Sequence, residues 1–335
     1  MKILLFLFSI FSQLVCQIKN LFYERKIFIP RKSPLPVISV GNIAFGGTEK
    51  TPLVMELMSF LIREGIKPAL ISRGYKGKWE KRGGVLSDGR KIFGTWKESG
   101  DEPFMVSQNI PQAGIFIGKQ RLISCQKAKE LGFQVAILDD GFQHRRLSRD
   151  LDIVLYDPQE KIALREGDFS LKRANILLLK NGVEIPLKKS LKEKFPQTEI
   201  FDYSVVNRGF FRLSAKESLP SESFKGKKIL SFCGIARAQR FITLLQEGGM
   251  EIAFFFNFPD HHSYPISSLE KIVKKYQELR PDAAMTTEKD AIKIIPNKNF
   301  LEKIPVYYLK IGLELEGKFY ERIKSFLQNI DNLQG

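Results

Sequence analysis

The sequence has 335 residues, of which 43% are apolar and 27% charged, so it can bury a sizeable core and form two ordinary domains, which excludes disorder. Lys and Arg exceed Asp and Glu by 53 to 37, and the formal net charge of +16 favours a phosphate-bearing partner over a merely soluble basic surface. Such a partner is a nucleic acid, an anionic membrane or a phosphorylated substrate. The three cysteines are too few and too far apart for a disulfide framework or a structural zinc site.

The first predicted element is an N-terminal helix within residues 1–28. Residues 3–16 are almost continuously apolar, but as a helix they cover about 21 Å against a hydrocarbon core of roughly 30 Å, so this run alone does not span a bilayer. Polar residues recur at three-to-four spacing, at Ser9, Ser12, Gln13, Gln17, Asn20 and Glu24, and Arg25, Lys26, Arg31 and Lys32 follow. We therefore expect a helix that lies in an anionic membrane face. A transmembrane helix lengthened through Tyr23, a cleaved signal peptide and an ordinary core helix remain alternatives.

Short β-rich runs then alternate with helical stretches. Strands are predicted at 37–40, 69–72, 114–117, 135–138, 153–156 and 176–179, and helices at 51–63 and 121–131. This alternation predicts a mostly parallel sheet covered on both faces over residues 29–197. The loop at 41–52 then makes this domain P-loop NTPase-like.

The rhythm changes in the middle of the chain. A polar stretch, residues 186–199, interrupts it, and residues 200–213 read as two extended pieces joined near Asn207, Arg208 and Gly209. We expect a hinge over 198–222. A smaller α/β domain over 223–335 follows, with strands at 229–232, 252–256, 283–286 and 306–309 and helices at 236–247, 267–279 and 317–328.

Residues 41–52, GNIAFGGTEKTP, resemble a phosphate-binding loop between a buried strand and an apolar helix. In such a loop, backbone amides from Gly46, Gly47 and Thr48 surround phosphate oxygens, Lys50 neutralises them and the Thr51 hydroxyl binds magnesium. An ordinary strand-turn-helix connection is the alternative.

Residues 135–146, VAILDDGFQHRR, are the second chemical signal. Four apolar residues ending in Asp139 and Asp140 describe a buried strand that delivers carboxylates to its C-terminal tip, where open α/β sheets bind ligands. A carboxylate beside Thr51 would complete a magnesium site. A solvated turn is the alternative.

Two further loops carry acids and histidines. SGDEP, residues 99–103, places Asp101 and Glu102 before a helix, where a carboxylate is often only a cap. FPDHHSY, residues 258–264, contains His261 and His262, and His144 is the chain's third histidine. Histidines beside acids in strand-end loops favour a site over plain turns.

Taken in order, these motifs resemble the tetraacyldisaccharide 4'-kinases, which phosphorylate the lipid A precursor. The resemblance covers nearly the whole chain. It includes ISRGYKG at 71–77, LDDGFQHRRLSRDLDIV at 138–154, LKRAN at 171–175, CGIARAQRF at 233–241 and TTEKDAIKI at 286–294, besides the loops above.

The resemblance implies two α/β/α domains joined by a short two-stranded linker, at the cytoplasmic face of a bacterial inner membrane. It implies transfer of the ATP γ-phosphate, with Mg²⁺, to an acylated glucosamine disaccharide 1-phosphate. By position, Lys50 handles phosphate, Thr51 and Asp139 handle the metal, and Asp101 is the base, assisted by His261. Asp140 and His144 flank the site, and Glu102, Arg121 and His262 support it or the acceptor.

The chain departs from the family pattern in two places. Glu49 stands where the family carries Gly. A carboxylate about 4 Å from a phosphate oxygen would be repelled by roughly 4 kcal/mol at an effective dielectric near 20, so we expect Glu49 to point outward to solvent or to pair with a cation. A weakened or lost nucleotide site is the alternative. The loop at 157–175 is shortened around Arg165 and Glu166, so acceptor contacts there are not carried over.

Two other functions compete with the kinase. A membrane-docked P-loop protein could bind nucleotide as a switch or scaffold, which needs only the loop and Asp139. Nucleic-acid binding lacks a motif, and the basic residues are dispersed. The sequence leaves the oligomeric state open.

Overall fold

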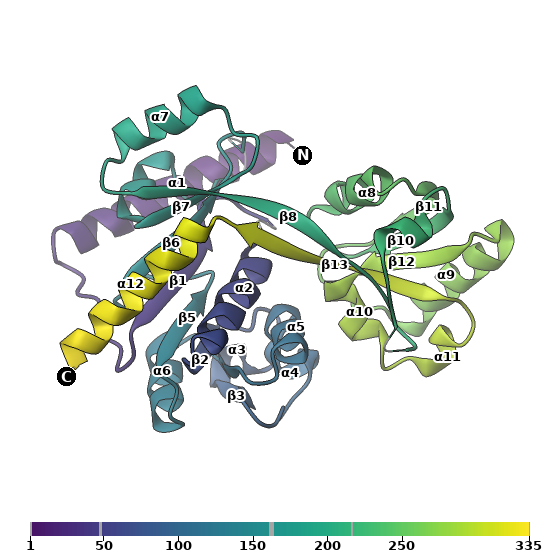
Figure 1. The fold of residues 1–335 in the computed structure, drawn as a ribbon, viewed down its shortest axis with the longest axis horizontal. Coiled ribbons are helices and arrows are strands. Elements are labelled where there is room, and N and C mark those ends of the chain that lie inside the picture. The colour runs from purple at the N-terminus through teal and green to yellow at the C-terminus, as the bar shows by residue number, and fades with distance from the viewer. Residues whose placement is uncertain (1, 47–48, 161–163, 216, 335) are drawn as a thin grey trace. The chain divides into compact units, whose positions relative to one another are not determined.

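A computed structural model of the chain describes residues 2–46, 49–160, 164–215 and 217–334. The chain forms two compact units (Figure 1). Unit 1 comprises Met1–Val205 and Leu313–Gly335, and unit 2 comprises Val206–Gly312. The predicted α/β class is confirmed in both.

Unit 1 is built on a mostly parallel sheet. Its strands are β1 (Val37–Asn42), β2 (Pro68–Ser72), β3 (Gly84–Asp88), β4 (Gly114–Ile117), β5 (Val135–Asp139), β6 (Leu151–Tyr156) and β7 (Ile176–Lys180), with the first part of β8 (Glu199–Arg212). The order is β8-β7-β6-β1-β5-β2-β4-β3, and in this series β3 pairs antiparallel with β4. β1, β2, β4, β5 and β6 are buried at every residue, as expected for strands covered on both faces.

The helices of unit 1 come from both ends of the chain and from the segments between its strands. They are α1 (Lys2–Glu24), α2 (Lys50–Arg63), α3 (Trp79–Arg82), α4 (Trp96–Ser99), α5 (Asp101–Asn109), α6 (Arg121–Glu130), η1 (Asp168–Arg173), α7 (Ile185–Lys194) and α12 (Gly317–Gln334). α2 buries Leu53, Leu57 and Leu61, which share one helix face, and packs against β1 and β5. This packing fixes where α2 begins relative to the ends of those strands.

Unit 2 is also built mainly on parallel strands. Its elements are β9 (Ser218–Leu219), η2 (Ser221–Phe224), β10 (Lys228–Cys233), α8 (Ala238–Glu247), β11 (Glu251–Asn257), α9 (Ile266–Leu279), β12 (Ala283–Thr287), α10 (Glu288–Ile294), α11 (Lys298–Leu301) and most of β13 (Val306–Leu315). The order is β11-β10-β12-β13. Two apolar clusters form its core, one containing Ile229 and Leu245 and the other Phe232 and Ile272.

The middle of the chain differs from the sequence-based expectation. Residues 185–194, read as a polar interruption, form helix α7, because Leu191 is buried on one side while the lysines stay in solvent. Residues 199–212 form one 14-residue strand, not two pieces. Gly209 adopts a φ of 101° within it, while β7 pairs with the first part of β8 and β9 with the last.

The C-terminal helix also groups differently from the expected 223–335 domain. α12 belongs to unit 1, where Phe319 lies 6.0 Å from Phe201 between ring centroids. The Tyr320 hydroxyl donates to Glu56 at 2.9 Å, and Lys324 lies 3.0 Å from Glu64. The unit to which a helix belongs depends on its tertiary contacts, and the order of the sequence does not reveal these.

Candidate functional site

The candidate site lies at the carboxyl ends of two neighbouring parallel strands in unit 1. Val40 of β1 pairs with Asp139 of β5, so β1 ends in Asn42 beside the end of β5 and Asp140. The loop after β1 leads into α2, whose first residue is Lys50. The fold therefore brings together the predicted Lys50, Asp139 and Asp140, as expected for ligand-binding edges of open α/β sheets.

Two cations share the Asp140 carboxylate. Lys50 Nζ lies 3.4 Å from Oδ1 and also donates to Asn42 Oδ1 at 3.2 Å, while Arg165 donates to Oδ2 at 2.6 Å. Burial alone raises the pKa of Asp140, but Lys50 and Arg165 outweigh it and hold the pKa below its usual range. Asp140 is therefore an anion that partly neutralises Lys50, the lysine predicted to bind phosphate.

Asp139 has the opposite electrostatic environment. Its side chain is buried and accepts one hydrogen bond from Ser72 Oγ, at 3.3 Å. Burial, followed by the charges of Glu102 and Asp140, raises the pKa of Asp139 to about 6, against the opposing effect of Lys50 and Arg121. A carboxylate in this position gains from a divalent cation.

The donor atoms at this edge fit Mg²⁺. Asp140 Oδ1 is buried, and among the described residues Lys50, at 3.4 Å, is the cation beside it, while Asp139 supplies a second carboxylate. Over the described ranges of the chain, no group of three or more His, Cys, Asp or Glu is arranged to hold a metal ion. Mg²⁺ commonly uses one or two carboxylates with phosphate oxygens and water, so this set is sufficient when nucleotide is bound.

The loop between β1 and α2 uses left-handed backbone conformations. Gly46 has a φ of 95° and Glu49 a φ of 50°. Gly47 and Thr48, both predicted phosphate-binding residues, lie outside the described residues. Thr51 lies in the first turn of α2. The half-buried Glu49 has a long contact, 3.5 Å, from the Tyr203 hydroxyl to its carboxylate.

The second acidic motif begins helix α5. Asp101 is buried at the first position of this helix and Glu102 follows it. Gly100, before them, has a φ of 89°, and a Cβ there would lie 2.9 Å from Tyr75 O, so this turn packs closely on the ISRGYKG loop. Glu102 is close enough to Asp139 to raise its pKa, which places this motif in the electrostatic environment of the site.

Arg121 lies near the two carboxylates, and His144 lies near Arg121. Arg121 is buried at the start of α6, where it donates to Gly118 O at 2.7 Å. Burial lowers its pKa to about 10, although Asp139 and Asp140 oppose this. Burial, then the charges of Arg121 and Lys19, lower the pKa of His144 to about 4, so this imidazole is neutral near pH 7.

The two remaining histidines lie in unit 2, in the loop after β11. His261 has a φ of 65°, its backbone N donates to Gly234 O at 3.0 Å, and its Nε2 lies 3.7 Å from Asp260. His262 stacks on Phe258 with 4.4 Å between centroids, and its Nε2 is 2.9 Å from Ser268 Oγ. These contacts order the loop within unit 2. The meeting of His261 with Asp101 of unit 1 in one cleft stays a prediction.

Two contacts at the site were missed from the sequence. Arg165 was noted only as part of a shortened loop, yet it pairs with Asp140, and Asn42 pairs with Lys50. The position of Asn42 at the end of the strand before the loop was a usable signal. Arg165 comes 25 positions after Asp140, and the sequence gave no signal that the two side chains would meet.

Comparisons with known proteins identify the family. The model of the tetraacyldisaccharide-1-P 4'-kinase family, LpxK, matches residues 1–328. The chain belongs to this kinase family. A tetraacyldisaccharide 4'-kinase of Desulfotalea psychrophila is 34% identical over 325 residues, 92% of each chain. One of Syntrophus aciditrophicus is 35% identical over 338 residues, covering 94% of this chain and 89% of that protein.

A solved LpxK structure shares the fold. The crystal structure of LpxK from Aquifex aeolicus in complex with ATP has a TM-score of 0.73 to this chain at 27% identity. The match covers 98% of this chain and 99% of the Aquifex chain, so the similarity extends over both units.

Proposed function

We propose that this protein is an ATP-dependent kinase of lipid A biosynthesis. It transfers the γ-phosphate of ATP to the 4'-hydroxyl of a tetraacylated glucosamine disaccharide 1-phosphate. The observation that carries the proposal is the gathering of Lys50, Asp139 and Asp140 at the edge of β1 and β5, in a chain that belongs to the tetraacyldisaccharide 4'-kinase family. The solved relative in complex with ATP supports the choice of nucleotide.

The residues divide the work of phosphoryl transfer. Lys50 and the loop that includes Gly46 bind the phosphates, while Asp139 and Thr51 would hold Mg²⁺. The bound ion supplies charge neutralisation and orients the phosphates. Asp140 keeps Lys50 oriented through their 3.4 Å contact. Phosphoryl transfer depends on such positioning and charge stabilisation more than on covalent catalysis.

Asp101 is the proposed base for the acceptor hydroxyl, and His261 assists it from unit 2. Asp101 is buried at the N-terminus of α5, where the helix dipole stabilises its anionic form and its side chain has little freedom. It therefore acts by orienting the hydroxyl. Arg121, His144, Glu102 and His262 support the site.

The acylated substrate implies work at a bilayer surface. In the part of the chain that the structure describes, no helix has both the length and the apolarity needed to cross a membrane. α1 instead exposes Phe11, Leu14 and Ile18, with 65%, 53% and 49% of their surface accessible. We propose that this face docks peripherally on an anionic inner-membrane surface, with Arg25, Lys26, Arg31 and Lys32 near the head groups.

A nucleotide-binding switch without lipid kinase activity is the competing function. It requires Lys50 and Asp139 but not Asp101. Membership of a family whose members are named as kinases favours the enzyme.

The test is to incubate the protein with ATP, Mg²⁺ and the acylated disaccharide 1-phosphate in several detergents. We expect labelled lipid product, and Asp101→Asn should lower kcat at least about 100-fold with ATP affinity unchanged. Glu130→Gln, a carboxylate-to-amide change at an exposed position of α6, is the matched control. ATP binding without lipid product in any detergent would favour the switch.

A further inference from the structure

The N-terminal helix turns its polar side toward the protein. Ser9 and Asn20 are only 1% and 4% exposed, whereas the apolar residues on the other side of α1 lie in solvent. The polar side of α1 therefore makes specific contacts with the rest of unit 1, while its apolar side is exposed.

The polar side of α1 contacts a three-residue segment, residues 164–166, next to the nucleotide site. Ser9 Oγ donates to Leu164 O at 2.9 Å and accepts from Leu164 N at 3.0 Å. Ser12 Oγ donates to Arg165 O at 3.2 Å, and Asn20 Nδ2 donates to Glu166 Oε2 at 3.1 Å. Side chains of one helix thus hold three consecutive residues.

The same segment is attached on its other side to the chain that follows β1. Leu164 forms a bridge with Ala44, and Arg165 N donates to Ile43 O at 2.7 Å. The backbone of Arg165 is thus hydrogen-bonded on both sides. Its guanidinium donates to Asp140 Oδ2 at 2.6 Å and lies 5.4 Å from the centre of the Phe45 ring. The position of Arg165 therefore depends on contacts made by α1.

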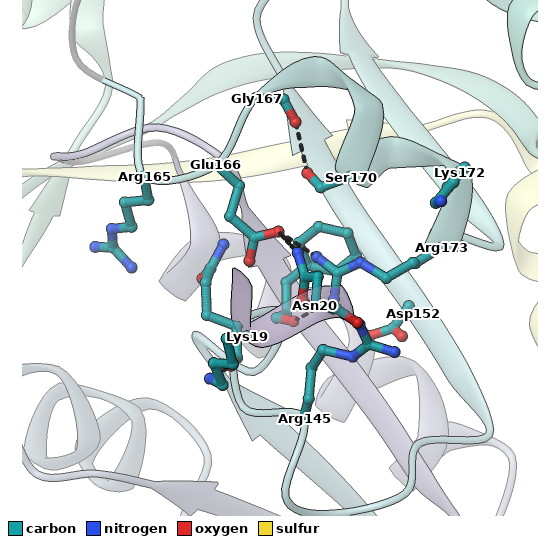
Figure 2. Close-up of polar contacts among 12 residues, drawn as sticks. Lys19, Asn20, Arg145, Asp152, Arg165, Glu166, Gly167, Ser170, Lys172 and Arg173 are labelled. Atoms are coloured by element: carbon teal, nitrogen blue, oxygen red, sulfur yellow. Dashed lines mark hydrogen bonds and ion pairs between the residues drawn. The ribbon is translucent and has the colours of Figure 1, made fainter. Parts of the chain in front are cut away.

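Glu166 is a buried carboxylate that connects α1 to Arg173. Its side chain is 2% exposed, and Figure 2 shows Asn20 of α1 and Arg173 both donating to the same oxygen of its carboxylate. Arg145 in turn donates to Asn20 Oδ1 at 3.0 Å, so the Asn20 amide uses both its donor and its acceptor. A buried carboxylate that loses one of its donors is strongly destabilised, so the segment would shift to find another.

We propose that Asn20 is a positioning residue of the nucleotide site. It fixes Glu166, and thereby keeps Arg165 on Asp140. Arg165 binds one oxygen of the Asp140 carboxylate. The charge of Arg165 weakens the attraction between Asp140 and Lys50, and the Lys50 ammonium group therefore stays available to phosphate. The inference rests on the proposed function only in taking Lys50 as the phosphate-binding group.

The experiment compares two amide truncations on the same helix. Asn20→Ala should weaken ATP binding about fivefold to tenfold, because Arg165 leaves Asp140 and the existing pair between Lys50 and that carboxylate then tightens. Gln17→Ala, at an exposed position one turn earlier, should change the affinity less than about twofold. ATP affinity is measured by equilibrium titration of the full chain in detergent.

A double-mutant cycle with Arg165→Ala separates positioning from general loosening. Asn20→Ala should cause no further loss of ATP affinity once Arg165 is absent. An equal loss in both backgrounds, or no loss in the native background, overturns the proposal. If Asn20→Ala does not fold, Asn20→Ser, which keeps a hydroxyl donor, is put through the same cycle with the same deciding outcomes.

The readout also separates this inference from the kinase assignment. A protein that binds ATP but makes no lipid product contradicts the kinase function, while the cycle on ATP affinity still decides the role of Asn20. Absence of ATP binding by the unaltered protein overturns both.

Discussion

At the scale of single residues, two adjacent aspartates have opposite electrostatic roles. Asp140 meets Lys50 and Arg165, which lower its pKa despite burial, whereas burial and neighbouring acids raise the pKa of Asp139 to about 6. Titratable groups whose pKa values are driven apart identify a division of work. Asp140 organises cations of the protein, and Asp139 is the better partner for an added cation.

The first prediction concerns the free energy cost of Asp139. Its pKa is higher in the folded than in the unfolded state, so the folded state binds the proton more tightly and stability falls as pH rises from about 4 to about 6. At pH 7.5 that cost is fully present. Asp139→Asn should therefore raise stability by at least about 1 kcal/mol, or roughly 2–4 °C in Tm, while abolishing Mg²⁺-dependent ATP binding.

The measurement is thermal unfolding of both proteins at several pH values, with Mg²⁺ and ATP omitted. The stability gain should shrink as the pH falls toward 4. A gain that does not depend on pH, or a loss at pH 7.5, would show that ionisation of Asp139 is not costly.

The second prediction concerns Glu49, the unexpected acid in the phosphate-binding loop. The Tyr203 hydroxyl approaches its carboxylate at 3.5 Å and gives it a partner other than the nucleotide. Tyr203→Phe should weaken ATP binding about tenfold, because a carboxylate that turns toward phosphate is repelled by a few kcal/mol at most. In a Glu49→Gly background, the same change should have no effect.

Glu49→Gly alone should also stabilise the protein by about 1 kcal/mol, since Glu49 has a φ of 50°. ATP titration and chemical unfolding of the four proteins in the cycle test both statements. A large gain in ATP affinity for Glu49→Gly alone would mean instead that the native carboxylate impairs the loop.

At the scale of elements, α1 has two different faces. Ser9 and Asn20 hold the 164–166 segment, and the apolar side is exposed. The expected three-to-four stripe of polar residues was correct as a pattern. Part of it nevertheless faces the protein, so the stripe does not simply mark a water-facing side.

The third prediction separates these faces. Replacing Phe11, Leu14 and Ile18 together by Ser should lower binding to vesicles containing phosphatidylglycerol at least about 100-fold, since burial of one large apolar side chain contributes about 1.5–3 kcal/mol. ATP affinity in detergent should stay unchanged.

Co-sedimentation with such vesicles measures the effect. Ile123→Ser, which alters a 56% exposed residue on α6, is the control and should bind vesicles like the unaltered protein. Vesicle binding that survives the triple substitution would contradict peripheral docking through α1.

At the scale of the whole molecule, unit 1 is assembled from two distant stretches of chain. α12 returns to it after unit 2 is complete, and Phe319 and Ile323 are fully buried there. The stability of the nucleotide-binding unit therefore depends on the last helix of the chain.

The fourth prediction follows from this assembly. Phe319→Ala should cost about 3–5 kcal/mol, because it removes a fully buried ring that packs on Phe201. Hydrogen exchange should speed up in peptides from β7 and α2 of unit 1 and stay unchanged in β10 and β12.

Phe300→Ala, in α11 of unit 2, is the matched control and should give the reverse pattern. Faster exchange in β10 and β12 of the Phe319→Ala protein, with unit 1 unchanged, would show that α12 does not stabilise the unit in which its contacts lie.

Local patterns in the sequence determined most of the strands and most of the long helices. Strands such as β1 and β5 were readable because a buried parallel strand is a continuous apolar run, and the acids at its end mark the ligand-binding edge. Periodicity, glycines and chain order carry this information within a few residues, so neighbours in space were not needed.

Only the tertiary structure decided which distant groups meet. Arg165 reaches Asp140, Asn20 reaches Glu166 across 146 residues, and α12 joins unit 1. No periodicity encodes such pairs, because a polar residue on a helix has the same spacing whether it faces water or a buried carboxylate. The free energy of the pair depends on burial and charge in the folded protein, and it decides whether the polar residue faces water or the buried carboxylate.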